Sequence, residues 1–341
     1  MTRVVSCILA TMLLLPAIQV RAAEPASLPE PEGYVALQKE SSDLFLAKDY
    51  TALDARMAHY VKQGTRSSSG RWASGIFAEN VLHGRGTPFA SHPESVAWWN
   101  DLEKQVKRWV DASPDSPLAR LVMTQVMMNH AWHIRGGGYA SSVPASAWKP
   151  FREEMSRARA YLLKETKIAS RYPEYYELRI DLETALNGDR KIVDAIYDEA
   201  TRRFPDYYPV YFSMTNYLLP KWHGDIDAVE AFARDAVQRS RKTEGQGMYA
   251  RIYWVVAQAQ FRDALFDESG VHWAHMRSGF DDVIKRYPDQ WNIQNYAHFA
   301  CLAKDHKTFR KLSPRIKPPA VPHVWTAPNT LEACRAEAMT R

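Results

Sequence analysis

A short pattern of an arginine, an aromatic residue, a proline and an acidic residue recurs along the chain and decides the fold class. It occurs as RYPEYY at 171–176, RFPDYY at 203–208 and RYPDQW at 286–291. The first two prolines are 32 positions apart. Each copy ends an amphipathic run and opens an apolar one, as expected for a helix-turn-helix unit of about 34 residues that stacks on copies of itself. The pattern predicts an all-α protein built from helical repeats.

The residues before each proline support the same prediction. Position −1 is aromatic and position −5 is apolar in all three copies, which places these side chains on one face of a helix. The units differ in length, because the second and third prolines are 83 positions apart. We therefore expect an α-solenoid with irregular repeat lengths.

Periodic apolar residues and capping signals predict helices along most of the chain. Asp49, Asp225 and Asp305 are expected N-caps. The predicted helices span 34–47, 49–63, 98–113, 118–134, 147–170, 191–204, 208–219, 226–240, 248–266, 272–287, 291–303 and 330–339. No alternating pattern typical of a β-strand was found.

The first residues have the features of a signal peptide at 1–22. Arg3 provides a basic start, residues 4–18 are largely apolar, and Val20 and Ala22 suit the −3 and −1 positions of a cleavage site. We expect cleavage after Ala22 and a periplasmic or secreted mature chain. The apolar run is too short for a membrane anchor, so no transmembrane segment is expected after cleavage.

The remaining chain divides by composition. A Pro-rich stretch at 23–33 predicts a flexible lead-in, and 34–112 an N-terminal helical part with an irregular loop at 64–95. Helical repeats are expected at 113–313. Five prolines between 314 and 328 predict an irregular tail that ends in a short helix, together covering 314–341.

The charge balance argues against a nucleic-acid partner. The chain has 44 Lys and Arg against 39 Asp and Glu, and only Arg3 and Arg21 fall in the leader, so the mature chain carries +3. Binding to phosphate backbones needs a clustered basic face, and no basic block stands out.

Two cysteines remain after removal of the leader, Cys301 and Cys334. In an oxidising compartment such a pair favours a disulfide, which would close a loop of about 34 residues worth roughly 3–4 kcal/mol. Two buried free thiols are the alternative. A bond would attach the tail to the last helical unit.

Two features together resemble a known family. The Arg-aromatic-Pro-acid helix ends and the turn at Ala47-Lys48-Asp49-Tyr50 resemble degenerate tetratricopeptide repeats. The segments GRW at 70–72, AWHIRGGGYA at 131–140 and LLPKWHG at 218–224 resemble a bacterial exported family of unknown function with such helical repeats. The resemblance implies an α-solenoid but transfers no catalytic residue, since the family has no assigned chemistry.

The segment from Trp132 to Tyr139 is the most distinctive candidate site. Three consecutive glycines free the backbone and expose amides beside Arg135. It predicts either a binding loop or a helix end that turns where a neighbour leaves no room for Cβ. The hypothetical binding residues are Trp132, His133, Arg135, Tyr139, Trp72 and Trp222.

Histidine pairs offer a second candidate chemistry. His130 and His133 are three positions apart, neighbours on a helix face that could hold Zn²⁺ with further ligands. The motif His-Glu-x-x-His is absent, and packing histidines are the favoured interpretation. No cofactor motif and no activated nucleophile was recognised.

The sequence favours a non-enzymatic scaffold that binds a peptide or protein partner in the envelope, because stacked helical hairpins form a concave surface. Binding of cell-wall glycan through tryptophans such as Trp72, Trp98 and Trp148 is one alternative. A metal-dependent enzyme that uses the histidine pairs is the other.

Overall fold

The computed structural model describes residues 28–85, 96–321 and 323–340. The predicted signal peptide at 1–22, residues 23–27 of the predicted lead-in and residues 86–95 of the predicted loop lie outside these ranges. Within them the fold is all-α, as predicted. No β-strand is present there, and one isolated bridge joins Arg66 and Trp72.

Most of the helices follow one another after short connections. In chain order they are α1 (Glu30–Leu46), α2 (Tyr50–Gln63), α3 (Ala73–Glu79), α4 (Val96–Ala112), α5 (Pro117–Arg135), α6 (Ala145–Lys164), α7 (Thr166–Ala169), α8 (Glu174–Ala185), α9 (Arg190–Arg203), α10 (Tyr208–Leu218), α11 (Ile226–Glu244), α12 (Gly247–Val256), α13 (Leu265–Glu268), α14 (Trp273–Arg286), α15 (Gln290–Leu302), α16 (His306–Leu312) and α17 (Leu331–Thr340).

Short polar side chains start many of these helices. The three predicted caps are confirmed: Asp49, Asp225 and Asp305 each accept a backbone N–H of the first turn, at 3.0, 2.8 and 3.0 Å. These bonds satisfy N–H groups that have no partner inside the helix.

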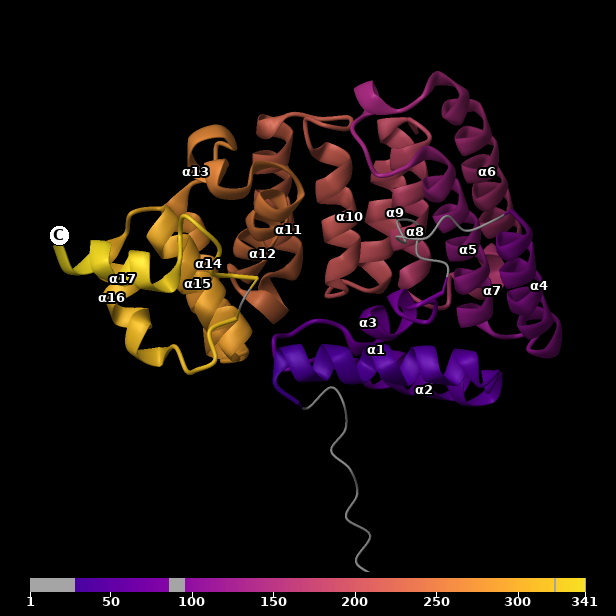
Figure 1. Ribbon diagram of the computed structural model, residues 1–341, viewed down its shortest axis with the longest axis horizontal. Helices are drawn as coiled ribbons and strands as arrows, with labels where there is room; N and C mark the ends of the chain where they lie inside the picture. The colour runs from indigo at the N-terminus through magenta and orange to yellow at the C-terminus, as the bar shows by residue number, and fades with distance from the viewer. Residues whose placement is uncertain (1–27, 86–95, 322, 341) are drawn as a thin grey trace, which may run out of the picture.

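Consecutive helices pack side by side and form a helical-repeat array (Figure 1). Helices α9, α11 and α14 bury one face and expose a charged one. By contrast, α8, α10, α12 and α15 are buried on almost every side, so we call them the inner helices.

The Arg-aromatic-Pro junctions occupy equivalent places in this array. Each one lies immediately before an inner helix: α8, α10 and α15. Tyr176 of the first junction packs against Phe204 of the second at 6.2 Å between ring centroids. The second and third junctions both contact residues 66–70, through Arg66 to Asp206 and Gly70 to Tyr287. The repeat signal in the sequence therefore corresponds to one row of turns.

The N-terminal segment, residues 30–79, covers this row. Helices α1 and α2 lie crosswise along one edge of the array in Figure 1. Ser69 accepts hydrogen bonds at its carbonyl oxygen from Arg251 of α12, at 3.2 Å, and Asn292 of α15, at 3.0 Å. Gly70 has φ +92°, and a Cβ at this position would lie 2.7 Å from the Tyr287 ring. Only glycine fits this close approach.

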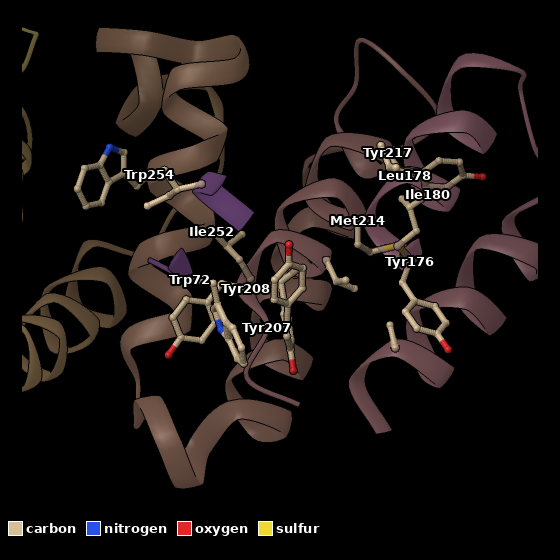
Figure 2. Packing of buried hydrophobic residues seen from close by; sticks show 14 of the residues in the cluster. Trp72, Tyr176, Leu178, Ile180, Tyr207, Tyr208, Met214, Tyr217, Ile252 and Trp254 are labelled. Carbon is tan, nitrogen blue, oxygen red and sulfur yellow. The ribbon is translucent and has the colours of Figure 1, made fainter. Parts of the chain in front are cut away.

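Trp72 fixes the end of the same loop. Its ring lies 5.3 Å from that of Tyr207, and its indole N–H donates to the Asp206 carbonyl at 2.6 Å. Figure 2 shows Trp72 beside Tyr207 and Tyr208, in the buried region between the N-terminal segment and the inner helices.

Three predicted boundaries were wrong. The predicted lead-in at 23–33 overlaps α1, which begins at Glu30 because Pro31 fits the first turn, where its missing N–H is not needed. The predicted irregular loop at 64–95 contains α3. The predicted helix at 248–266 ends at Val256 and continues as a π-helical turn over residues 257–261.

The predicted disulfide between Cys301 and Cys334 is confirmed. It joins α15 to α17 across the tail, and Arg310 of α16 donates to the Ala338 carbonyl at 2.7 Å. The tail is therefore attached to the last helical unit, as expected.

Candidate functional site

The triglycine segment ends α5 for a conformational reason. Gly136 has φ +79°, and a Cβ at this position would meet nothing within 4 Å. The expectation that a neighbour leaves no room for Cβ is therefore wrong at Gly136. The backbone angle, which side chains rarely adopt, requires the glycine.

Arg135 holds this loop in place. Its Nη1 donates to the carbonyl oxygens of Gly136 at 2.9 Å and Gly138 at 3.0 Å. The guanidinium lies over the rings of Trp132 and Trp148, at 5.2 and 5.0 Å from their centroids. Cation–π contacts of this kind favour a fixed orientation of the charge. Burial among these rings lowers the pKa of Arg135.

These side chains line a cavity of about 450 Å³, which we call the tryptophan pocket. The end of α5 and the start of α6 form one wall, and the turns after α8 and α10 form the other. Of the six predicted binding residues, four line it: Trp132, Arg135, Tyr139 and Trp222. Its other lining residues are Gly137, Gly138, Ala140, Trp148, Phe151, Arg152, Ala185, Asn187, Lys221 and His223.

Trp222 reaches the pocket from a turn that lies 90 positions after Trp132 in the chain. The two indole rings meet edge to face at 6.3 Å, and Trp132 also packs on Phe151 at 5.0 Å. The indole nitrogen of Trp222 is buried and has no hydrogen-bond partner among the described residues. Tyr139, on the opposite rim, is 84% exposed. The pocket thus has packed aromatic walls and an exposed rim at Tyr139.

The charges of the tryptophan pocket are all positive. Arg135, Arg152 and Lys221 line it, and no Asp or Glu is among its described lining residues. None of the three forms an ion pair within the part of the chain that the structure describes. Lys221 donates to the Ala259 carbonyl at 2.8 Å, and burial lowers its pKa. An anion would offset these charges, of which Arg135 and Lys221 are partly desolvated.

The other two predicted residues lie elsewhere. Trp72 packs at the start of α10 and Trp222 follows its end, so the eleven residues of this helix separate them by about 16 Å. His133 packs against Trp99 at 5.5 Å and does not line the pocket. Trp72 and His133 therefore do not belong to one site with the other four.

The histidine pair is held by packing. The His130 ring stacks on Trp99 at 5.1 Å, and its Nδ1 lies 3.2 Å from Oε1 of Glu154. In the described ranges, no three His, Cys, Asp or Glu side chains are close enough together to hold a metal ion. The arrangement gives the metal hypothesis no support.

The comparisons with known proteins concern only the first half of the array. Residues 40–180 match the model of DUF4034, a domain of unknown function. No curated protein and no solved structure gave a match. The matched region holds Trp132, Arg135 and Tyr139 but ends before Lys221 and Trp222, so it covers one wall of the tryptophan pocket.

A membrane-spanning role finds no support in the helices. None of those in the described ranges is both long and apolar enough to cross a bilayer.

Sequence reasoning missed a second polar region, on the inner face of α8. Glu174, Glu177 and Asp181 line cavities between this helix and the N-terminal segment. A signal was present: the positions between these acids are mostly Tyr, Leu and Ile, as in a helix buried on all sides. Acids in such a helix must also face the interior.

Proposed function

We propose that this chain is a non-enzymatic binding protein of the bacterial envelope, and that its tryptophan pocket holds an acidic segment of a peptide or protein partner. One observation carries the proposal: Arg135, Arg152 and Lys221 line an aromatic pocket that contains no described carboxylate. The predicted leader and the disulfide suit an exported protein.

The chemistry of the pocket suggests the type of segment. Guanidinium groups bind carboxylates through two parallel hydrogen bonds, and Lys221 adds a point charge. Trp132, Trp148 and Trp222 offer apolar surface at little cost in side-chain entropy, as anchor residues of interfaces do. A carboxylate next to a Leu or Phe side chain would use both features.

The test is a fluorescence titration of the full chain with a short peptide that alternates Glu with Leu and Phe. Three of the chain's 11 tryptophans, Trp132, Trp148 and Trp222, line the pocket, so binding there should change part of the fluorescence. We expect quenching by this peptide, none by its Gln counterpart, and weaker binding at higher salt. Arg152→Glu should weaken binding at least 10-fold, since hydrogen bonds to charged groups contribute about 1.5–3 kcal/mol.

Lys149→Glu is the matched control. Lys149 lies on the same helix and undergoes the same charge change, but it does not line the pocket. Equal affinity for the Glu peptide and the Gln peptide would contradict the proposal. An equal loss of affinity in Arg152→Glu and Lys149→Glu would also contradict it. If glycan fragments quench the fluorescence and acidic peptides do not, the glycan alternative is favoured, since sugar rings also stack on indoles.

A further inference from the structure

Three carboxylates form a row along α8. Glu174, Glu177 and Asp181 are spaced i, i+3 and i+7, which places them on one face of the helix over about 10 Å. The row faces the N-terminal segment rather than solvent. We call these three residues the carboxylate row.

The row lines two adjoining cavities of about 230 and 170 Å³. Gly75, Glu79, Glu177 and Asp181 line both, so the two cavities adjoin along these residues. The remaining walls come from α3, α5 and α10 and include neutral polar groups such as Gln125, Ser213 and Asn216. Glu79 is exposed and Asp181 half-buried, so the space connects to solvent.

No cation of the protein pairs with the row in the described ranges. Arg71 and Arg251 line the larger cavity, but Arg71 lies 3.2 Å from Glu79 and Arg251 lies 3.2 Å from Glu244. From α3 the row faces a further acid, Glu79. From the α10 side it faces the neutral Tyr207 and Tyr208, and Tyr207 donates to Glu177 at 3.0 Å.

Glu174 is the least satisfied member. It is 4% exposed and lines the smaller cavity, yet neither of its carboxyl oxygens has a hydrogen-bond partner among the described residues. Buried polar groups without partners are rare and call for an explanation. A ligand in the cavity would supply the missing partner.

Burial makes the charged forms unfavourable in the empty cavity. It raises the pKa of Glu174 to about 7 and of Asp181 to about 6. Burial and the neighbouring acids Asp181, Glu79 and Glu174 raise the pKa of Glu177 well above its usual range. A bound cation would reverse these shifts and release protons.

We propose that the carboxylate row binds a flexible aliphatic chain bearing primary ammonium groups. The spacing of neighbouring acids, about 4.5 and 6 Å along the helix, resembles that of ammonium groups on a three- or four-carbon chain. A metal ion fits less well, because the acids are spread out rather than gathered around one point. General electrostatic attraction is not the cause, since the whole chain carries +5.

The ammonium chain has two possible sources, a free polyamine or the lysine side chain of a peptide. The inference stands without the tryptophan pocket, because the two sites share no lining residue. The site is therefore tested by itself.

The experiment is calorimetry on the full chain at pH 7 with spermidine, 1,4-diaminobutane and N-acetyl-lysine amide. We expect a Kd below about 1 mM for at least one amine. Titrations in two buffers of different ionisation enthalpy should show proton release on binding. Affinity should fall as the pH is lowered from 8 to 5, because the carboxyls then hold their protons. Binding of spermidine or 1,4-diaminobutane would identify a free polyamine as the source. Binding of N-acetyl-lysine amide would identify a lysine side chain.

Asp181→Asn and Glu177→Gln should each weaken binding at least 10-fold. Glu153→Gln, on the exposed face of α6, is the matched control and should leave it unchanged. Absence of amine binding to the unaltered chain, equal binding of uncharged 1,4-butanediol, or unchanged affinity in folded Asp181→Asn would overturn the proposal. If Glu177→Gln fails to fold, the amine titration of the unaltered chain still tests the proposal.

Discussion

Glu174 is the residue at which burial and charge conflict most directly. Its pKa in the folded chain is about 7, whereas an unfolded Glu titrates near 4.5. Between these values the folded chain holds a proton that the unfolded chain releases. The contribution of Glu174 to the free energy of unfolding therefore falls as the pH rises from about 4.5 to about 7 and is level above that.

Glu174→Gln should remove this part of the pH dependence, because an amide stays neutral as the protonated acid does. At pH 8 we expect the variant to be more stable than the unaltered chain by up to about 3 kcal/mol. At pH 4.5 the two should be similar. Urea midpoints at both pH values measure the difference. If the free energy of unfolding of Glu174→Gln falls with pH between 4.5 and 8 as steeply as that of the unaltered chain, Glu174 is not the cause. Glu153→Gln serves as the control.

At the scale of single residues, the sequence located residues of the tryptophan pocket but not the carboxylate row. Trp132, Arg135 and Tyr139 were found because three glycines beside Trp and Arg are chemically unusual. Trp222 was named from its own motif, but its contact with Trp132 depends on how α10 stacks on the neighbouring helices. The carboxylate row was missed because single acids in a helix usually indicate a solvated face.

At the scale of elements, periodicity and caps predicted most helices, but not the position of the N-terminal segment. The stretch at 64–72 is rich in Ser and Gly, a composition typical of an exposed loop. Its order comes from partners far away in the chain, such as Asp206, Arg251 and Asn292. Local sequence carries no record of such contacts.

Arg66 is the clearest test of how this segment is attached. Its Nη2 lies 2.8 Å from Oδ2 of Asp206, and its guanidinium lies over the rings of Trp72 and Tyr208 at 4.2 and 4.6 Å. The ion pair is only partly exposed, so Arg66→Ala should cost about 2 kcal/mol and leave Asp206 without its partner.

The expected readout is that Arg66→Ala accelerates hydrogen exchange in α1, α2 and α3 more than in α6 or α9. Arg190→Ala is the control, since Arg190 forms an exposed pair with Asp194 within α9, at 2.7 Å, worth less than about 0.5 kcal/mol. Equal effects of both substitutions would mean that the contacts of Arg66 do not hold the N-terminal segment in place.

At the scale of the whole molecule, the N-terminal segment changes how stability is distributed. In a simple helical-repeat array each unit contacts only its neighbours, so units unfold almost independently. Here Arg66 reaches the start of α10, and Ser69 reaches α12 and α15. We infer that the units from α10 to α15 unfold together. Helices α16 and α17 lie beyond these contacts.

Loss of the disulfide should therefore act locally. In the double variant Cys301→Ser/Cys334→Ser, the end of the chain loses a crosslink worth roughly 3–4 kcal/mol in the chain-entropy model. Helix α17 packs only on α15 and α16 among the described helices with substantial contacts, so it should detach first.

We expect amide exchange in α17 to accelerate about 100-fold or more, with less than about 3-fold change in α8 and α10. Hydrogen exchange followed by mass spectrometry measures both regions in one experiment. Uniform acceleration would show that the tail belongs to the same cooperative unit as the inner helices, and no acceleration would show that non-covalent contacts alone hold α17.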